Sequence, residues 1–201
     1  VSCAYPYGIS KLQDDRGAFQ MQEDVNFSVI SLRQGTVSGH SARMRFDLVV
    51  NVMFKNALHK QLLTVNNPNI WRPIVDLRDC CQAWLRAVEA ESTISGTFNI
   101  ASGNWTIGEV AEIVKMTIEH LEPKLSVEIV QKNIHDMRNY RVAVTRAVDI
   151  LGFRPCYGVA DIVKQLYEHR ARYGSCEDDE FYNILMFHRL KKNLTQLGPA
   201  P

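Results

Sequence analysis

Residues 6–12 read Pro-Tyr-Gly-Ile-Ser-Lys-Leu, and they open a stretch, 5–24, whose pattern predicts a helix. Side chains four positions apart on a helix share a face, so the Tyr7 phenol and the Lys11 ammonium group are expected side by side. A phenol has a pKa of ~10, and a neighbouring cation favours its ionised form. Such a pair can take a proton from an alcohol or give one to a carbonyl. The alternative at this spacing is an aromatic side chain at the edge of the core beside a solvated lysine.

Strands and helices alternate along the rest of the chain. The hydrophobic spacing predicts strands at 27–33, 62–65, 73–77, 97–101 and 126–131, and helices at 46–59, 79–90, 106–121, 145–151 and 158–173. Asp79 is the expected N-cap of its helix, and Thr106 and Glu109 match a capping box. Residues 34–45 are expected to form a loop. This alternation predicts an α/β protein with parallel strand pairing, and the sequence has no glycine-rich phosphate loop.

Composition excludes several classes of function. The 201 residues carry 23 Lys and Arg against 22 Asp and Glu, and 46% of them are hydrophobic. The small net charge gives no electrostatic reason to expect a nucleic acid or an anionic membrane as a partner, and no apolar run is long enough to span a bilayer. The five cysteines are irregularly spaced and the histidines are scattered, so the pattern favours a reduced, cytoplasmic protein without a metal site.

Several segments in order resemble the extended short-chain dehydrogenase/reductase family, in its nucleotide-sugar epimerase/dehydratase branch. The first are the Tyr-Gly-x-Ser-Lys helix and a strand that ends in Arg-Gln-Gly-Thr-Val-Ser-Gly. Further matching segments lie at 71–79, 96–103, 136–140 and 151–155, so that the resemblance covers about residues 5–170. The ordered set is much more specific than any one segment.

The resemblance implies the C-terminal part of a Rossmann-like doubly wound sheet plus a small α/β substrate-binding domain. Residues 1–40 would end the Rossmann-like domain, 41–173 would form mainly the substrate domain, and 174–201 a partly ordered tail with a solvated acidic run. Family members carry a glycine-rich dinucleotide fingerprint before the tyrosine. This chain lacks that fingerprint, and it begins without Met. Strand 27–33 is therefore expected to expose an edge that further strands would cover.

The resemblance also implies roles on the cofactor side of the site. Tyr7 would be the acid/base, and Lys11 would lower its pKa and bind the ribose next to the nicotinamide of NAD or NADP. Gln34, Thr36 and Val37 would lie where the family's loop meets the nicotinamide. Gln34 stands where the family usually has proline.

On the substrate side, the resemblance implies that Asn51 lies on a helix that contacts the diphosphate of a nucleotide sugar. Arg72 and Arg138 would clamp this diphosphate, since a guanidinium group matches two phosphate oxygens. Arg43, with Arg45 close by, is a similar candidate. The alternative for each arginine is a surface ion pair or a solvated face.

Two functions follow as hypotheses. The first is an NAD(P)-dependent epimerase, dehydratase or ketoreductase of nucleotide sugars, of which this chain is the catalytic and substrate-binding half and which forms a homodimer through the Tyr-Lys helix. The second is a truncated, non-catalytic module that binds a diphosphate or dimerises. A glycine-rich motif upstream of Tyr7 would favour the enzyme.

Overall fold

The computed structural model describes residues 6–24, 27–132 and 139–196. Its helices are α1 (Pro6–Asp24), α2 (Val49–Lys60), α3 (Leu77–Val88), α4 (Ile107–Leu121), α5 (Thr145–Leu151), α6 (Val159–Glu168) and α7 (Asn183–Gln196), with short 3-10 turns η1 (Arg170–Arg172) and η2 (Asp179–Phe181). The strands are β1 (Ile30–Gln34), β2 (Thr36–Ser38), β3 (Leu62–Asn66), β4 (Trp71–Asp76), β5 (Gly96–Ile100), β6 (Gly103–Thr106) and β7 (Glu128–Lys132).

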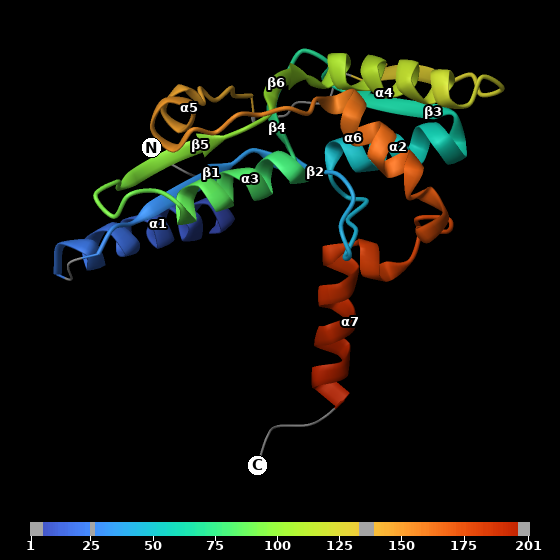
Figure 1. Ribbon diagram of the computed structural model, residues 1–201. Helices are drawn as coiled ribbons and strands as arrows, with labels where there is room; N and C mark the ends of the chain where they lie inside the picture. Colours follow the sequence, from blue (N-terminus) through green and yellow to red (C-terminus); the bar gives the residue numbers. More distant parts are fainter. Residues whose placement is uncertain (1–5, 25–26, 133–138, 197–201) are drawn as a thin grey trace.

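The strands form three small sheets in which parallel pairing prevails. β1 pairs with β5, β2 with β4, and β3 with β7, all in parallel, whereas β4 and β6 pair antiparallel. Gly35 separates β1 from β2, and its N–H donates to the Ile100 carbonyl at 2.8 Å. A Cβ atom at position 35 would lie 2.9 Å from the Pro73 carbonyl oxygen, so only glycine fits this crossing. The predicted α/β class with parallel strands is confirmed (Figure 1).

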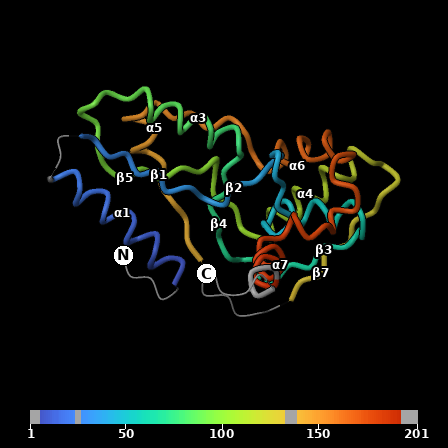
Figure 2. The backbone as a smooth tube through the Cα atoms, turned by 90° about the horizontal axis from the view of Figure 1, so that it is seen from below, coloured from blue at the N-terminus to red at the C-terminus, as the bar shows by residue number. Residues whose placement is uncertain are grey.

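Two hydrophobic clusters support these sheets. The larger one contains side chains of α2, α4 and α6, among them Phe54, Ile118 and Leu166. The smaller one packs Phe98 and Phe153 between α3, α5 and the β1–β5 pair. Figure 2 shows the two groups of elements at opposite ends of the molecule, with β2 and β4 between them. The strands that leave the β1–β5 end therefore deliver their C-terminal residues to the middle of the molecule.

Several predicted boundaries are confirmed. Thr106 Oγ1 accepts from the Glu109 N–H at 3.1 Å, and Glu109 Oε2 accepts from the Thr106 N–H at 2.7 Å, which completes the capping box of α4. α5 ends at Gly152, whose φ of 67° is the left-handed conformation that glycine adopts at little cost. α1 and the strands β3, β4, β5 and β7 also lie close to their predicted positions.

Other boundaries need correction. The N-cap of α3 is Asp76, which accepts from the Arg78 N–H at 2.8 Å, and Asp79 lies inside the first turn with 1% of its surface exposed. The expected loop 34–45 contains β2, because residues 36–38 complete the ladder of β4. β6 was not predicted, and α6 ends at Glu168 before the turn η1.

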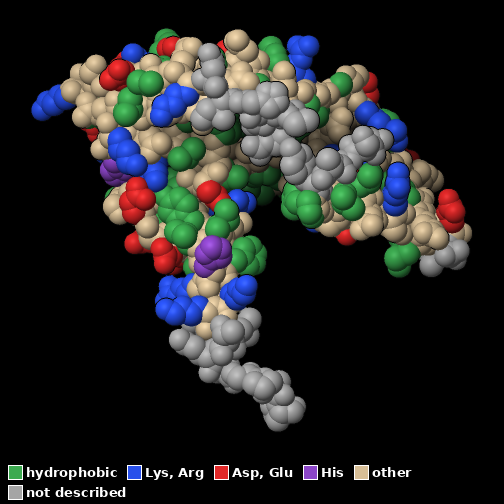
Figure 3. Space-filling model, turned by 180° about the vertical axis from the view of Figure 1, so that it is seen from behind, with side chains coloured by type: hydrophobic (Ala, Val, Ile, Leu, Met, Phe, Trp, Pro, Cys, Tyr) green, Lys and Arg blue, Asp and Glu red, His purple; other side chains and the backbone are tan. Residues whose placement is uncertain are grey.

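Residues 174–181 are not a peripheral tail. Cys176 and Phe181 belong to the larger core, and the Phe46 N–H donates to the Phe181 carbonyl at 3.1 Å. Glu177, from the acidic run expected to be solvated, pairs with Lys55 at 3.0 Å. Apolar residues at 176 and 181 flank the acidic run, and their burial draws the segment onto α2. α7 then stands clear of the body (Figure 1), and Figure 3 shows hydrophobic and basic side chains on its surface.

In the described part of the chain, β1 pairs only with β5, as the exposed-edge prediction anticipates. α1 is joined to this strand by polar contacts, since Arg33 Nε donates to Asp15 Oδ2 at 2.8 Å. Within the same described residues, no helix has the length and apolar content needed to cross a bilayer.

Candidate active site

A cavity of about 770 Å³ opens between α1, the β1–β2 crossing and the loop that leads to α2. Residues from four separate stretches of sequence meet at its walls. The side chains expected to contact cofactor or substrate that line it are Tyr7, Lys11, Gln34, Thr36, Val37, Arg43 and Asn51. Gly35, Ser38, Gly39, Ser41, Arg45, Leu48, Leu77 and Tyr140 complete the lining, together with Leu32.

Tyr7 and Lys11 lie on one face of α1, one turn apart. The Lys11 ammonium nitrogen is 5.9 Å from the centre of the Tyr7 ring and 3.2 Å from Asp14 Oδ2. Tyr7 is 76% exposed, so its hydroxyl is open to the cavity and to solvent. The arrangement places a proton-carrying phenol and a cation next to each other at an accessible wall.

Gln34, Thr36 and Val37 lie at the crossing from β1 to β2. Thr36 and Val37 pair with Ile74 and Val75 of β4, which fixes the backbone of the cavity wall. These residues therefore line the cavity from the end of β1 and from β2 rather than from the expected loop.

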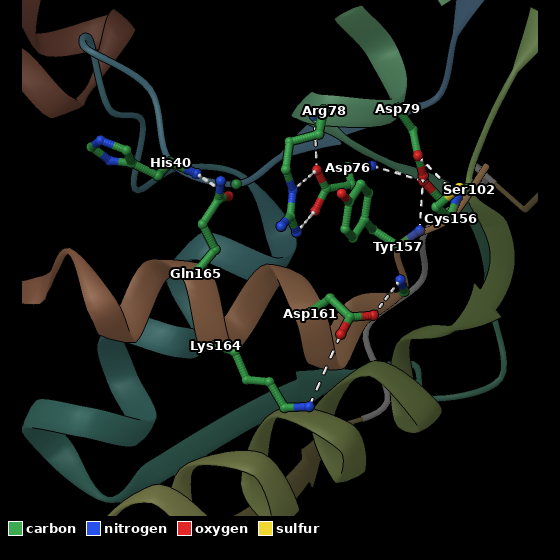
Figure 4. Close-up of polar contacts among 12 residues, drawn as sticks. His40, Asp76, Arg78, Asp79, Ser102, Cys156, Tyr157, Asp161, Lys164 and Gln165 are labelled. Atoms are coloured by element: carbon green, nitrogen blue, oxygen red, sulfur yellow. Dashed lines mark hydrogen bonds and ion pairs between the residues drawn. The ribbon is translucent and has the colours of Figure 1, made fainter. Parts of the chain in front are cut away.

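Asn51 holds the next part of the wall from the first turn of α2. Its side chain is 2% exposed, and its Oδ1 accepts from the Gly39 N–H at 3.3 Å. Its Nδ2 donates to the Arg45 carbonyl at 2.8 Å. Gln165 of α6 holds the same turn from the other side, because its Oε1 accepts from the His40 N–H at 3.0 Å (Figure 4). Gly39 has φ of 126°, which favours glycine at this turn.

The two arginines of the cavity loop have different partners. Arg45 Nε and Nη2 each donate to one carboxylate oxygen of Asp47 at 3.0 Å, so this side chain forms a bidentate ion pair. Arg43 Nη2 donates to Asn183 Oδ1, a neutral amide oxygen, at 2.8 Å.

Arg72 lies beside the cavity rather than in its lining. Its guanidinium carbon is 6.0 Å from the centre of the Tyr140 ring, and Tyr140 is a wall residue. Its Nη1 donates to the Trp71 carbonyl at 2.9 Å. Arg138 lies outside the described residues, so the shared clamp of Arg72 and Arg138 stays a prediction.

A polar network behind the cavity was not identified as such in the sequence. Asp79 Oδ1 accepts from the Cys156 N–H at 2.9 Å, and Asp79 Oδ2 accepts from the Ser102 hydroxyl at 2.5 Å and from the Tyr157 N–H at 3.2 Å (Figure 4).

Arg78 stacks on the Tyr157 ring at 3.5 Å and forms a bidentate pair with Asp76, and this hydrogen-bonded pairing raises the pKa of Arg78. Asp76 and Arg78 flank Leu77 of the cavity wall, so their ion pair fixes the end of β4 there.

A cluster of aromatic and imidazole rings lies at the outer side of the Gly39–His40 turn. The His40 and His169 rings are stacked with centroids 3.9 Å apart, and the Tyr173 hydroxyl lies 2.7 Å from His40 Nδ1. Burial, the His169 ring and the Arg172 guanidinium lower the pKa of His40. Burial raises the pKa of Tyr173, so its hydroxyl stays protonated and can donate to a neutral His40 ring. In the part of the chain that the structure describes, no group of side chains could hold a metal ion.

Known proteins resemble this chain in both sequence and fold. The NAD dependent epimerase/dehydratase family model matches residues 3–101. UDP-glucuronic acid decarboxylase 5 of Arabidopsis thaliana is 30% identical over 120 residues, which cover 58% of this chain and 34% of that protein. UDP-glucuronic acid decarboxylase 6 of the same plant is 29% identical over the same length. The aligned part thus spans about a third of these relatives.

Solved structures share the fold at low sequence identity. RMD from Pseudomonas aeruginosa, complexed with NADPH, has a TM-score of 0.71 and 20% identity over 85% of this chain and 58% of that chain. UDP-glucuronic acid 4-epimerase from Bacillus cereus, complexed with UDP-glucuronic acid and NAD, has a TM-score of 0.67 and 20% identity over 83% of this chain and 52% of that chain.

These likenesses and the parallel strands define a partial Rossmann-like α/β fold. The resemblance to the NAD dependent epimerase/dehydratase family, stated from the sequence, is confirmed by the family model that matches residues 3–101 and by the decarboxylase relatives. The alignments leave the roles of the cavity residues as predictions.

Proposed function

We propose that this chain is the catalytic and substrate-binding half of an NAD(P)-dependent epimerase, dehydratase or ketoreductase that acts on a nucleotide sugar. The observation that carries the proposal is the cavity itself. Tyr7 and Lys11 enter it from α1, Gln34 to Val37 from the strand crossing, and Arg43 and Asn51 from the loop and helix beyond. The relatives crystallised with NADPH, or with NAD and UDP-glucuronic acid, support the same ligand classes.

The residues present fit the nicotinamide end of NAD or NADP. The Tyr7 hydroxyl and Lys11 ammonium group can bind ribose hydroxyls, and Gln34, Thr36 and Val37 give the cavity wall both polar and apolar groups. When bound, the cofactor supplies the acceptor or donor of a hydride. The adenosine and pyrophosphate end requires a glycine-rich turn, and the sequence contains none.

In this proposal Tyr7 carries the proton of the reaction. Its phenolate form accepts the proton of a sugar hydroxyl as the hydroxyl carbon is oxidised, and its phenol form returns a proton when a carbonyl is reduced. Lys11, one helical turn away, places its ammonium nitrogen 5.9 Å from the centre of the Tyr7 ring. Asp14 contacts Lys11 at 3.2 Å from the next turn and tethers the ammonium group on the same face.

The substrate side would hold the anionic diphosphate. Arg43 faces the cavity directly, and Arg72 stands behind Tyr140 at its rim. Both carbonyl and amide of the Asn51 side chain are engaged with backbone. We therefore assign Asn51 to holding the cavity loop in place rather than to the direct diphosphate contact expected from the sequence. The boundary between the two domains at residue 40 and a homodimer formed through α1 are parts of the same proposal.

The test is turnover by the complete enzyme. Replacement of Tyr7 by Phe removes the proton carrier and keeps the ring, so kcat should fall by about 10²–10⁴-fold. Met21→Leu, at another exposed position of α1, is the matched control and should leave kcat unchanged. A folded Tyr7→Phe variant with full kcat would show that the proton is carried by another group. If the protein binds the nucleotide sugar but does not convert it, the alternative of a non-catalytic diphosphate-binding module is favoured.

A further inference from the structure

The C-terminal segment reaches the cavity through one side chain. Asn183, the first residue of α7, accepts a hydrogen bond from Arg43 of the cavity wall, with 2.8 Å between Asn183 Oδ1 and Arg43 Nη2. The two residues are 140 positions apart in sequence, so the contact exists only because the C-terminal segment folds back on the cavity loop.

The backbone on both sides of this contact is firmly anchored. On one side, Phe181 is buried in the core and its carbonyl accepts from the Phe46 N–H. Tyr182, next to Asn183, receives a hydrogen bond from Lys55 at 2.8 Å, and its own hydroxyl donates to the Cys176 carbonyl at 2.8 Å. These contacts determine where the amide of Asn183 can lie.

On the other side, the base of the cavity loop is equally fixed. Met44 and Phe46 are buried at 2% and 0% exposure, and the Ser41 hydroxyl donates to the Arg43 carbonyl at 2.6 Å. The backbone of the loop is therefore fixed, and the hydrogen bond to the Asn183 amide orients the Arg43 side chain.

The chemistry of the partner matters as much as its position. An amide oxygen orients a guanidinium group without neutralising it, whereas Arg45 is already paired with the Asp47 carboxylate. Among the described residues, no carboxylate forms an ion pair with Arg43. Arg43 thus keeps a full positive charge and unused N–H donors toward the cavity.

We propose that Asn183 is a positioning residue for Arg43, and that Arg43, rather than Arg45, takes up an anionic phosphoryl group of the ligand. This inference rests on the proposed function, since it assumes that the cavity receives a nucleoside diphosphate. It makes the start of α7 part of the site, although the sequence placed residues 174–201 outside it.

The test uses the 201-residue chain and Asn183→Asp, which keeps the shape and introduces a competing carboxylate. Calorimetric titration with UDP-glucuronic acid should show affinity reduced about tenfold, because the new carboxylate competes with the phosphoryl group for the Arg43 guanidinium. The salt dependence of binding should fall at the same time. Asn67→Asp, the same change at the β3–β4 turn outside the cavity, should bind as the unaltered chain does.

A ligand-free measurement separates the two proposals. In thermal unfolding, Asn183→Asp should raise the melting temperature about 1–2 °C more in the unaltered chain than in an Arg43→Gln background, because only the former gains an ion pair. Equal shifts in both backgrounds, or unchanged binding and salt dependence in Asn183→Asp, would overturn the role of Asn183. If the unaltered chain binds no UDP-glucuronic acid while the unfolding difference appears, the contact stands and the proposed nucleotide-sugar substrate fails.

Discussion

Gly39 and Asn51 are joined by a hydrogen bond from the backbone of a cavity turn to a buried side chain of α2, with 3.3 Å between donor and acceptor. Asn51 Nδ2 also donates to the Arg45 carbonyl, so a single side-chain amide holds both ends of the loop that carries Arg43. The site therefore depends on the larger core, on which α2 is packed, as well as on the strands that end at the cavity.

Asn51→Ala should destabilise the chain by about 2–3 kcal/mol, because two hydrogen bonds are lost and the Gly39 N–H stays buried. Urea unfolding measures the change. The control is Asn56→Ala on the same helix, where the Oδ1 atom is buried without a hydrogen-bond partner in the described structure, so truncation should cost much less. Equal losses in the two variants would mean that the loop contact contributes no stability.

Asp79→Ala should cost about 3 kcal/mol or more. The carboxylate is 1% exposed and serves the Ser102 hydroxyl and the N–H groups of Cys156 and Tyr157, which the variant would leave without an acceptor. Asp149→Ala, on the exposed surface of α5, should stay within about 0.5 kcal/mol. Chemical denaturation compares the two. A small effect at Asp79 would show that water replaces the carboxylate freely.

Acidification should destabilise the turn at His40. The pKa of His40 is lowered in the folded chain. Below about pH 6.5 the unfolded chain therefore binds more protons than the folded one, and the free energy of unfolding decreases as the pH is lowered. A proton on His40 also meets the stacked His169 ring and the Arg172 guanidinium, and it removes the acceptor of the Tyr173 hydroxyl.

The His40→Gln variant should therefore lose less melting temperature than the unaltered chain between pH 7 and pH 5. His188→Gln, on the exposed surface of α7, should keep the original pH dependence. Thermal unfolding across this pH range measures the difference. If the melting temperature depends on pH equally in His40→Gln and in the unaltered chain, the acid effect comes from other groups.

The 201-residue chain alone should bind NAD⁺ or NADP⁺ only weakly. Tyr7 and Lys11 can contact the nicotinamide ribose, but the pyrophosphate needs the amides of a glycine-rich turn and a helix N-terminus. Each ~1.4 kcal/mol of lost contact lowers affinity tenfold. Calorimetric titration is the check, and a micromolar dissociation constant from a monodisperse monomer would show that the chain needs no further half for its cofactor.

Local sequence patterns predicted the ends of helices well where the capping residues lie within a few positions of one another. Thr106 with Glu109, and Gly152, mark helix ends through contacts made within a few residues. The prediction of Asp79 as the N-cap of α3 was wrong. Asp76, three residues earlier, is an aspartate that can cap the helix equally well, and the end of β4 at Asp76 decides between them. The ladder partner that makes residues 36–38 a strand is also distant in sequence.

The candidate site was predictable from family resemblance but its supports were not. Tyr7, Lys11, Arg43 and Asn51 are recognisable in order along the chain, and the structure brings them to one cavity. Gln165 and Asn183 contact this cavity loop from 125 and 140 positions away, and no local pattern marks them. The acidic run at 177–180 suggested an exposed segment, so the burial of Cys176 and Phe181 on either side of it was not predicted.

We propose that the cavity between α1 and the loop before α2 receives the nucleotide sugar. Hydrogen–deuterium exchange of the 201-residue chain, with and without UDP-glucuronic acid, tests it most directly. We expect slower exchange in residues 40–45, because a diphosphate held by Arg43 would order the loop around it, and little change in α4 at the far side of the core. Unchanged exchange in residues 40–45 at saturating ligand, or protection confined to other elements, would contradict the claim.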